Sequence, residues 1–286
     1  MLLVDFSNLS FSSALAYTNM TGETLDMPLL RHILLKRLLS TVRSKRKSNE
    51  RVVCCIDSKD HWRKDIFPNY KHGRKKSRDD SKMDWNYFFE QYSLLKYEFR
   101  KNIPYHFIEV DRVEADDIIY ALALKYHPHE RILIISSDRD FLQLQQTVSS
   151  KIQQYSIAVN RLITPEDSDY DLFTHVLRGD PGDGIPNFYA PDDHFVSEER
   201  QRQKPLSMKN LKEWSRYGLS KPEVFCKSAE HYDGFMRNLK LIDMRQIPEE
   251  ILESIYEEFE DTKVVNNLMN YLMENGCFNI IKEITK

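Results

Sequence analysis

The chain has 286 residues, of which 30% are charged and 41% are hydrophobic, and its formal net charge is −3. This composition is typical of a soluble globular protein that can bury a substantial core. No apolar run approaches the roughly 20 residues that a membrane span requires, so no membrane partner is expected. The chain starts directly in a strand-like run without a signal-type segment, and we expect a cytoplasmic location.

The charge is distributed unevenly along the chain. Residues 31–51 contain eight Lys or Arg and one acid, and residues 59–78 contain eight bases and two acids. From residue 246 to the end there are nine acids and three lysines. A polyanion would therefore be attracted to one side of the protein. The four cysteines include no C-x-x-C pair, and neither zinc nor disulfides are indicated.

Strand and helix patterns alternate in the first half of the chain. Buried strands are predicted near residues 2–6, 52–57, 105–110 and 131–137. Crossover helices are predicted near residues 28–42, 113–125 and from 141 onward. A polar loop is expected after the first strand, and a weak hairpin over 151–164. This alternation predicts an α/β fold with a mostly parallel central sheet and helices on both faces.

Two regions are predicted. Residues 1–164 form the α/β domain, with an insertion at about 59–103 that is long for a connection and is typical of a functional lid. Residues 165–286 form a smaller helical region with a loop-rich stretch at 179–207. The candidate helices of this region are near residues 167–178, 207–216, 221–240, 249–260 and 263–275.

Nine carboxylates occupy positions where such a sheet brings acids together. Asp5 and Asp57 each follow an apolar strand directly, and open α/β sheets bind ligands at the carboxyl ends of their strands. Clustered acids repel one another in a low-dielectric crevice unless bound cations neutralise them. Carboxylate ligands suit Mg²⁺, with Mn²⁺ as a substitute. The candidate metal ligands are Asp5, Asp57, Glu114, Asp116, Asp117, Asp138, Asp140, Asp180 and Asp183.

Each acid motif also has a simpler interpretation. Residues 111–114 could form a helix capping box, an acid at 138–140 could cap the next helix, and 180–184 could be an ordinary turn. A capping box does not explain further acids at 116 and 117 in the same helical turn. The joint order of the acids favours two magnesium ions about 3.5–4 Å apart, which activate water and stabilise the leaving oxygen in phosphodiester hydrolysis.

The insertion begins with a basic segment that is interleaved with aromatic residues. Trp62, Phe67 and Tyr70 could stack bases while the neighbouring cations hold phosphates, as in proteins that bind single-stranded ends. A solvated surface is the simpler interpretation for residues 75–78. The aromatic run over 85–95 is assigned to helix packing. The candidate nucleic-acid-binding residues are Arg63, Lys64, Tyr70, Lys71, Arg74 and Lys75.

Six motifs follow one another in the order Asp5, Asp57, Tyr70-Lys71-x-x-Arg74, Glu114-Ala115-Asp116-Asp117, Asp138-x-Asp140 and Gly179-Asp180-x-x-Asp183. This order resembles the 5′ nuclease family, which includes the flap endonucleases and the RNase H enzymes of T-even bacteriophages. The resemblance covers roughly the first 250 residues. It implies a PIN-like 5′ nuclease fold with a helical arch, and magnesium-dependent 5′ to 3′ hydrolysis of RNA–DNA hybrids, DNA duplexes and flaps. It also implies removal of RNA primers in lagging-strand replication.

The resemblance assigns roles to individual residues. By matching motif, Asp5, Asp57, Glu114, Asp116 and Asp138 resemble the tighter metal site, and Asp140, Asp180 and Asp183 resemble the second. Asp117 would act through water. Lys71 and Arg74 resemble the basic residues at the base of the arch, and together with Asp116 and Asp138 they are the catalytic candidates. The implied partners of this monomer are a duplex with a 5′ flap or fork, an RNA–DNA hybrid and a replication single-strand-binding protein, in the cytoplasm of a bacterial host.

One segment departs from the broader family. After Asp183 many members have a glycine-rich helix-hairpin-helix that grips duplex DNA, but residues 187–193 lack those glycines. The helical region is expected to contain a helix-hairpin-helix-like duplex-binding segment, in which duplex contact is expected from a mobile basic loop. Its candidate basic residues are Arg200, Arg202, Lys204, Lys209 and Lys212. Two alternatives stay open, namely a PIN-type ribonuclease and a structure-specific DNA-binding protein with weak catalysis.

Overall fold

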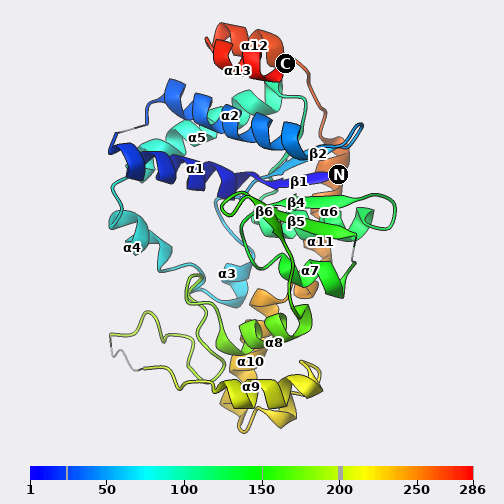
Figure 1. Ribbon diagram of the computed structural model, residues 1–286. Coiled ribbons are helices and arrows are strands. Elements are labelled where there is room, and N and C mark those ends of the chain that lie inside the picture. Colours follow the sequence, from blue (N-terminus) through cyan, green and yellow to red (C-terminus); the bar gives the residue numbers. More distant parts are fainter. Residues whose placement is uncertain (24, 150, 199–201, 286) are drawn as a thin grey trace.

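The computed structural model describes residues 1–23, 25–149, 151–198 and 202–285 (Figure 1). In this part of the chain a six-stranded sheet has the strand order β3-β2-β1-β4-β5-β6. All neighbouring strands are parallel except β5 and β6, which form an antiparallel hairpin. The strands are β1 (Leu2–Asp5), β2 (Val52–Cys55), β3 (His106–Ile108), β4 (Ile132–Ile135), β5 (Ile152–Ser156) and β6 (Arg161–Ile163). The predicted parallel sheet and its terminal hairpin are confirmed.

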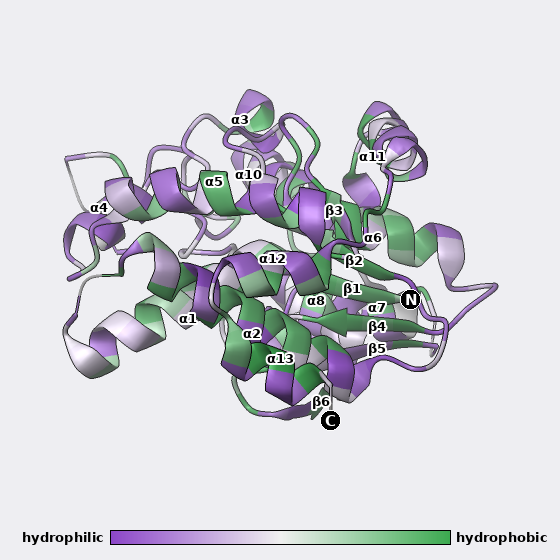
Figure 2. Ribbon diagram, turned by 90° about the horizontal axis from the view of Figure 1, so that it is seen from above, coloured by the Kyte–Doolittle hydropathy of each residue, from purple (hydrophilic) through white to green (hydrophobic). Residues whose placement is uncertain are grey.

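Helices cover both faces of the sheet. Side chains alternate along each strand, so Leu2 and Val4 enter one apolar core while Met1 and Leu3 enter the other. Figure 2 shows the apolar strands enclosed between helices whose outer sides are hydrophilic. The first face is covered by α1 (Phe6–Thr21), α2 (Met27–Lys45), α5 (Trp85–Asn102), α12 (Leu268–Glu274) and α13 (Phe278–Ile284). The second face is covered by α6 (Ala115–Tyr126), α7 (Leu142–Thr147) and α11 (Glu249–Asp261).

A third apolar core holds the helical region together. Its aromatic members Phe173, Phe188, Phe225 and Phe235 are buried, and they pack against one another. Figure 1 shows this region below the sheet, on the side opposite α12 and α13. Its elements are α8 (Ser168–Arg178), α9 (Met208–Trp214), α10 (Ala229–Ile242) and the short 3-10 helices Ser215–Tyr217, Pro222–Val224 and Met244–Gln246.

The predicted insertion at 59–103 has two structurally different parts. Its first part contains α3 (Arg63–Ile66) and α4 (Arg74–Asp79), and α4 stands at the side of the molecule, away from the sheet (Figure 1). Its second part is α5, which buries Phe88, Tyr92 and Phe99 against the sheet. The packing role predicted for this aromatic run is thus confirmed, and only the segment around α4 projects as an arch would.

A helix, α1, replaces the polar loop that was expected after the first strand. Asp5 caps it by accepting a hydrogen bond from the backbone N–H of Asn8 at 2.9 Å. Its many serines weaken the helical periodicity, but Phe6, Leu9 and Ala14 are buried. Packing against the sheet therefore stabilises a helix that the sequence pattern did not indicate.

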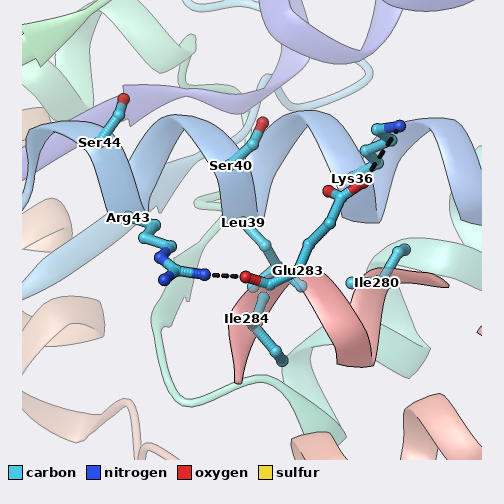
Figure 3. A pocket seen from close by; sticks show the side chains of 8 residues that line it. All are labelled: Lys36, Leu39, Ser40, Arg43, Ser44, Ile280, Glu283 and Ile284. Atoms are coloured by element: carbon cyan, nitrogen blue, oxygen red, sulfur yellow. Dashed lines mark hydrogen bonds and ion pairs between the residues drawn. The ribbon is translucent and has the colours of Figure 1, made fainter. Parts of the chain in front are cut away.

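Other helix boundaries also differ from the prediction. The helix expected over 221–240 begins only at Ala229, because Pro222 starts a separate 3-10 turn that ends before the Ser228 cap. The C-terminal α13 was not expected, and it packs against α2. Between these two helices lies a pocket in which Arg43 donates to the carbonyl oxygen of Glu283 (Figure 3). No candidate site residue lines it. None of the helices in the described ranges is long and apolar enough to span a membrane.

Candidate active site

The first acid cluster is built at the carboxyl ends of neighbouring strands. Asp5 ends β1, Asp57 follows β2 and Asp138 follows β4, and β1 lies between β2 and β4 in the sheet. The chain passes from β1 toward β2 and later returns to β4 on the other side, which makes this a topological switch point. Asp57 accepts a hydrogen bond from the backbone N–H of Ala115 at 2.8 Å, which brings the start of α6 to the same place. The predicted convergence of these acids is observed.

Electrostatic repulsion dominates this cluster. Burial, together with the charges of Asp57 and Asp138, raises the pKa of Asp5 to about 7. Burial and the charges of Asp138 and Asp5 raise the pKa of Asp116 well above its ordinary value. The hydroxyl of Ser136 donates to Asp5 at 2.9 Å and offsets part of this cost. The cluster is thus short of positive charge, as expected of carboxylates that bind cations.

Glu114 and Asp117 have positive partners of their own. They form the capping box of α6, with Glu114 as its N-cap. The guanidinium of Arg63 donates to Glu114 at 2.8 Å and to Asp117 at 2.8 Å, and the indole N–H of Trp62 donates to Asp117 at 2.9 Å. The capping box therefore joins residues 114 and 117 rather than 111 and 114. Because both oxygens of Asp117 are engaged by these donors, the prediction that it takes part in metal binding does not fit its position.

The predicted arch-base residues join the two halves of the site. Lys71 pairs with Glu114 and lies 3.8 Å from the carboxylate of Asp183, while Arg74 pairs with Asp183 at 2.6 Å. The hydroxyl of Tyr70 donates to Glu114 at 3.0 Å and to Asp183 at 3.2 Å. Burial alone would lower the pKa of Lys71, but the charges of Glu114 and Asp183 raise it above that of an ordinary lysine. Lys71 and Arg74 are therefore cations held beside the acids.

The second acid cluster lies between β4 and the end of α8. Burial raises the pKa of Asp140 to about 7, although His175 opposes this shift, and Asp138, Asp180 and Asp183 contribute to it. Asp180 accepts hydrogen bonds from the backbone N–H groups of Gly182 at 2.8 Å and Asp183 at 3.3 Å, as in an Asp-initiated turn. Asp180 therefore stabilises a turn, as the simpler interpretation expected, and it also belongs to the second acid cluster. Neither Asp138 nor Asp140 caps α7, which begins at Leu142.

Several candidate nucleic-acid contacts lie in the interior instead. Trp62, Phe67 and Tyr70 are 6%, 1% and 5% exposed, and Arg63 is 5% exposed. They are buried because the segment after β2 folds back onto α6 and onto the core of the helical region. The expectation that these aromatic rings stack bases, and that Arg63 contacts nucleic acid, is therefore wrong for this arrangement. Lys64, which pairs with Asp60, is partly exposed, and Lys75 is exposed.

Two residues near the acids were not predicted. His175 of α8 lies between Asp140 and Asp180, and its two ring nitrogens are 3.3 Å and 3.6 Å from their carboxylates. Ser136 links Asp5 to the β4 end through its hydroxyl. A histidine five positions before Asp180 in a helix is compatible with an ordinary surface position, so the sequence carried no specific signal for it. Ser136 directly precedes the Ser137-Asp138 pair, which is a weak signal at best.

The donor set fits hard divalent cations by its chemistry. Within the described parts of the chain, no three His, Cys, Asp or Glu side chains converge closely enough to hold an ion in their present positions. Asp5, Asp57 and Asp138 nevertheless gather at the carboxyl ends of neighbouring strands, and burial together with the neighbouring acids raises the pKa of Asp5, Asp116 and Asp140. Carboxylate oxygens are the ligands that magnesium and manganese prefer.

The loop after Asp183 is fixed by α10. The guanidinium of Arg237 donates to the carbonyl oxygens of Pro186, Asn187 and Ala190 at 3.0 to 3.2 Å and pairs with Asp192 at 2.5 Å. These contacts fix residues 186–192, the stretch in which the sequence lacks the glycine-rich hairpin of other family members. Of the basic residues proposed for duplex contact, Arg200 lies outside the described residues. Lys204 lies over the ring of Tyr189.

The site combines a parallel sheet, acids at the carboxyl ends of its strands and cations beside them. This combination is typical of nucleases that cleave phosphodiester bonds. Residues 1–170 match the family described as 5′-3′ exonuclease, N-terminal resolvase-like domain, and residues 166–286 match the C-terminal domain of T4 RNase H. The first match covers more than half of the chain, and the chain therefore belongs to the 5′-3′ exonuclease family. The second match does not fit a PIN-type ribonuclease, which lacks such a helical region.

Relatives with known names support this assignment. The chain is 27% identical to Ribonuclease H of Enterobacteria phage T4, over 99% of this chain and 94% of the relative. It is 26% identical to a 5′-3′ exonuclease of Buchnera aphidicola subsp. Schizaphis graminum, over 65% of this chain and 64% of the relative. The predicted resemblance to the 5′ nucleases and their phage RNase H branch is confirmed.

Solved structures share the fold. A complex of the bacteriophage T5 flap endonuclease with DNA and metal ions has a TM-score of 0.63 and 17% identity, with 91% of this chain and 98% of that chain covered. The T5 protein co-crystallised with metal ions has a TM-score of 0.64 and 16% identity, with the same coverage. The predicted PIN-like 5′ nuclease fold is thereby confirmed. The T5 enzyme also holds divalent ions such as zinc, consistent with a family that depends on divalent metals.

Proposed function

We propose that this nuclease is a magnesium-dependent 5′ to 3′ enzyme that hydrolyses RNA–DNA hybrids, DNA duplexes and 5′ flaps, and that it removes RNA primers during lagging-strand replication. The carrying observation is that Asp5, Asp116 and Asp138 lie together at the carboxyl edge of the sheet while Lys71 stands beside them. The 27% identity to phage T4 Ribonuclease H across nearly the whole chain supports the hybrid substrate.

The residues divide into two proposed metal sites. Asp5, Asp57, Asp116 and Asp138 would hold the first ion, and Asp140, Asp180 and Asp183 the second. Glu114 borders the first site, where Lys71 and Arg63 already neutralise it. Two bound divalent ions would activate a water molecule and neutralise charge on the leaving oxygen. Asp117 is left out of this set, because it serves the Arg63 network.

The chain's own cations would bind and orient the substrate. Lys71 is largely buried and is held by Glu114, so its ammonium group is positioned at one place with little freedom. Preorganised charge of this kind favours the transition state, where negative charge on the phosphate is greatest. Arg74 is half-exposed and reaches outward from the same segment, which suits a contact with an adjacent phosphate. Lys64 and Lys75 lie further out and would hold the strand without sequence readout.

A substrate panel tests this proposal. The protein is incubated with a 5′-flap duplex, a blunt DNA duplex, an RNA–DNA hybrid and single-stranded RNA, each labelled at the 3′ end, with Mg²⁺ or with chelator. We expect labelled products that shorten with time on the hybrid, the duplex and the flap in Mg²⁺, and no products in chelator. Degradation from the 3′ end, or equal cutting throughout single-stranded RNA, would overturn the assignment.

The same panel addresses the DNA-binding alternative. A structure-specific binding protein with weak catalysis would bind the flap and leave it intact even in excess Mg²⁺.

Binding should weaken steeply with salt, with log K falling by about 0.9 per phosphate neutralised on duplex. Adding a single-strand-binding protein to the assay tests whether such a protein stimulates cleavage. Light scattering tests whether the nuclease is a monomer.

A further inference from the structure

Arg237 of α10 is an arginine whose charged group is enclosed by the protein. Its side chain is only 6% exposed. A guanidinium has five N–H donors, and the structure shows five acceptors around this one. The acceptors are the carbonyl oxygens of Pro186, Asn187 and Ala190, Oδ1 of Asp192 and Oδ1 of Asn238. Because its donors are engaged inside the protein, Arg237 is not a residue for direct contact with substrate.

The loop formed by residues 186–192 depends on these donors, because it has no helix or strand of its own. A buried carbonyl oxygen without a donor destabilises the fold. The loop also rests directly on α10, since a Cβ added at Gly234 would stand 2.3 Å from the carbonyl oxygen of Phe188. A lysine could not take the place of Arg237, because its three donors spread from a single atom. The course of the loop is therefore set by α10.

The same loop lies against the segment that carries Lys71. At one end, Nδ2 of Asn69 donates to the carbonyl oxygen of Asp192 at 3.1 Å. At the other end, the backbone N–H of Lys71 donates to the carbonyl oxygen of Asp183 at 2.7 Å. The guanidinium of Arg237 reaches this segment as well, because it lies 5.7 Å from the ring centroid of Phe67. The loop and Arg237 thus contact residues 67–71 at three points.

Both of the segments that Arg237 holds carry groups of the proposed site. Lys71 and Arg74 follow Phe67, and the carboxylate of Asp183, which pairs with Arg74, precedes the loop. Resting on the proposed function, we propose that Arg237 is a positioning residue for cleavage, which sets where Lys71 stands relative to Asp183. A displacement of about 1 Å at a reacting group can cost about 100-fold in rate. The competing explanation is that Arg237 only stabilises the helical region.

Amide hydrogen exchange measures this coupling without using activity. In Arg237→Met we expect the amides of residues 186–192 and of residues 67–71 to exchange faster together, including the amide of Lys71. Phe225→Leu is the matched control, because it shortens a fully buried ring of the same core without changing any donor to the loop. It should lower stability and leave the exchange of residues 67–71 as it is. Unchanged exchange of residues 67–71 in Arg237→Met, or the same pattern in Phe225→Leu, would overturn the inference and leave the proposed nuclease intact.

Single-turnover cleavage of a 5′-flap duplex tests the consequence for the reaction. At saturating substrate and Mg²⁺, Arg237→Met should lower the rate by about tenfold or more, while its affinity for the flap changes much less. Phe225→Leu, and Lys240→Met at an exposed position of the same helix, should keep the wild-type rate while they are folded. A wild-type rate in folded Arg237→Met would contradict the inference. An unaltered protein that cleaves no flap in Mg²⁺ would overturn both the inference and the proposed function.

Two further variants keep the test independent of a folding defect. Arg237→Lys retains the charge and most of the volume, yet it should still be slowed, because three donors cannot serve five acceptors. Arg237→Ala leaves space for a free guanidinium ion, so guanidinium at concentrations far below denaturation should raise its rate severalfold, whereas sodium at equal ionic strength should not. A full rate in Arg237→Lys, or a folded Arg237→Ala that guanidinium does not accelerate, would show that Arg237 has no positioning role.

Discussion

The ammonium group of Lys71 is paired with the carboxylate of Glu114, a residue 43 positions further along the chain. The backbone of Lys71 adopts a positive φ of 59°, and its N–H donates to the carbonyl oxygen of Asp183 at 2.7 Å. These two contacts, to Glu114 and to Asp183, thus hold one lysine at the junction of the two acid clusters. This rigid placement is the basis for separating its effect on catalysis from its effect on binding.

Lys71→Ala should lower the single-turnover cleavage rate by about 100-fold or more, because a preorganised cation acts mainly on the transition state. Binding of a 5′-flap substrate should change much less. Lys75→Ala is the matched control, since Lys75 is exposed and belongs to the same segment. It should weaken binding modestly and leave the rate of bound substrate unchanged. If both variants weaken binding equally and leave the cleavage rate unchanged, the segment is an ordinary charged surface without a catalytic role.

Asp138→Asn should reduce cleavage by several orders of magnitude while flap binding is retained, because the carboxylate is proposed to hold metal and the cations hold phosphate. The exposed Asp111→Asn is the control and should retain full activity. Circular dichroism must show that both variants are folded. If Asp138→Asn keeps more than about a tenth of the wild-type rate, a loss of under about 1.4 kcal/mol, Asp138 is not a ligand.

Arg63→Met should destabilise the protein by about 3–5 kcal/mol, because it leaves the buried carboxylates of Glu114 and Asp117 without their shared partner. Lys64→Met alters the neighbouring residue, whose pair with Asp60 is exposed, and should cost at most about 1 kcal/mol. Chemical denaturation of both variants measures the difference. A large loss of substrate binding in folded Arg63→Met, without a loss of stability, would instead support its original prediction as a nucleic-acid contact.

The metal-free protein should become less stable as pH rises from about 4 to about 7. The pKa values of Asp5 and Asp140 are raised from 3.8 to about 7 in the folded state, so over this range the folded state binds more protons than the unfolded state. The free energy of unfolding in chelator should therefore decrease toward pH 7. Asp5→Asn should flatten this dependence. Mg²⁺ should restore stability near pH 7, and a chelated protein that is equally stable throughout would contradict the clustering of charges.

Much of the fold was predictable because its signals are local. The apolar runs that end at Asp5 and Asp57, and the run before Asp138, are strands by composition alone. Their acids converge because parallel strands place their carboxyl ends at one edge, which holds without any side-chain detail. The helix α1 was missed since its serines hide its periodicity, and its stability comes from burial of Phe6 and Leu9.

The order of strands, acids and basic residues by itself determined the sheet, the position of the acid clusters and the family. Only the tertiary structure decided what each charged or aromatic side chain does there. Arg63, Trp62 and Tyr70 read as surface contacts in the sequence, yet they are interior because the segment folds back onto α6. His175 carried no signal, since its neighbours Asp140 and Asp180 meet it only across the packed end of α8. Such roles depend on contacts between residues far apart in the chain, and periodicity carries no information about those contacts.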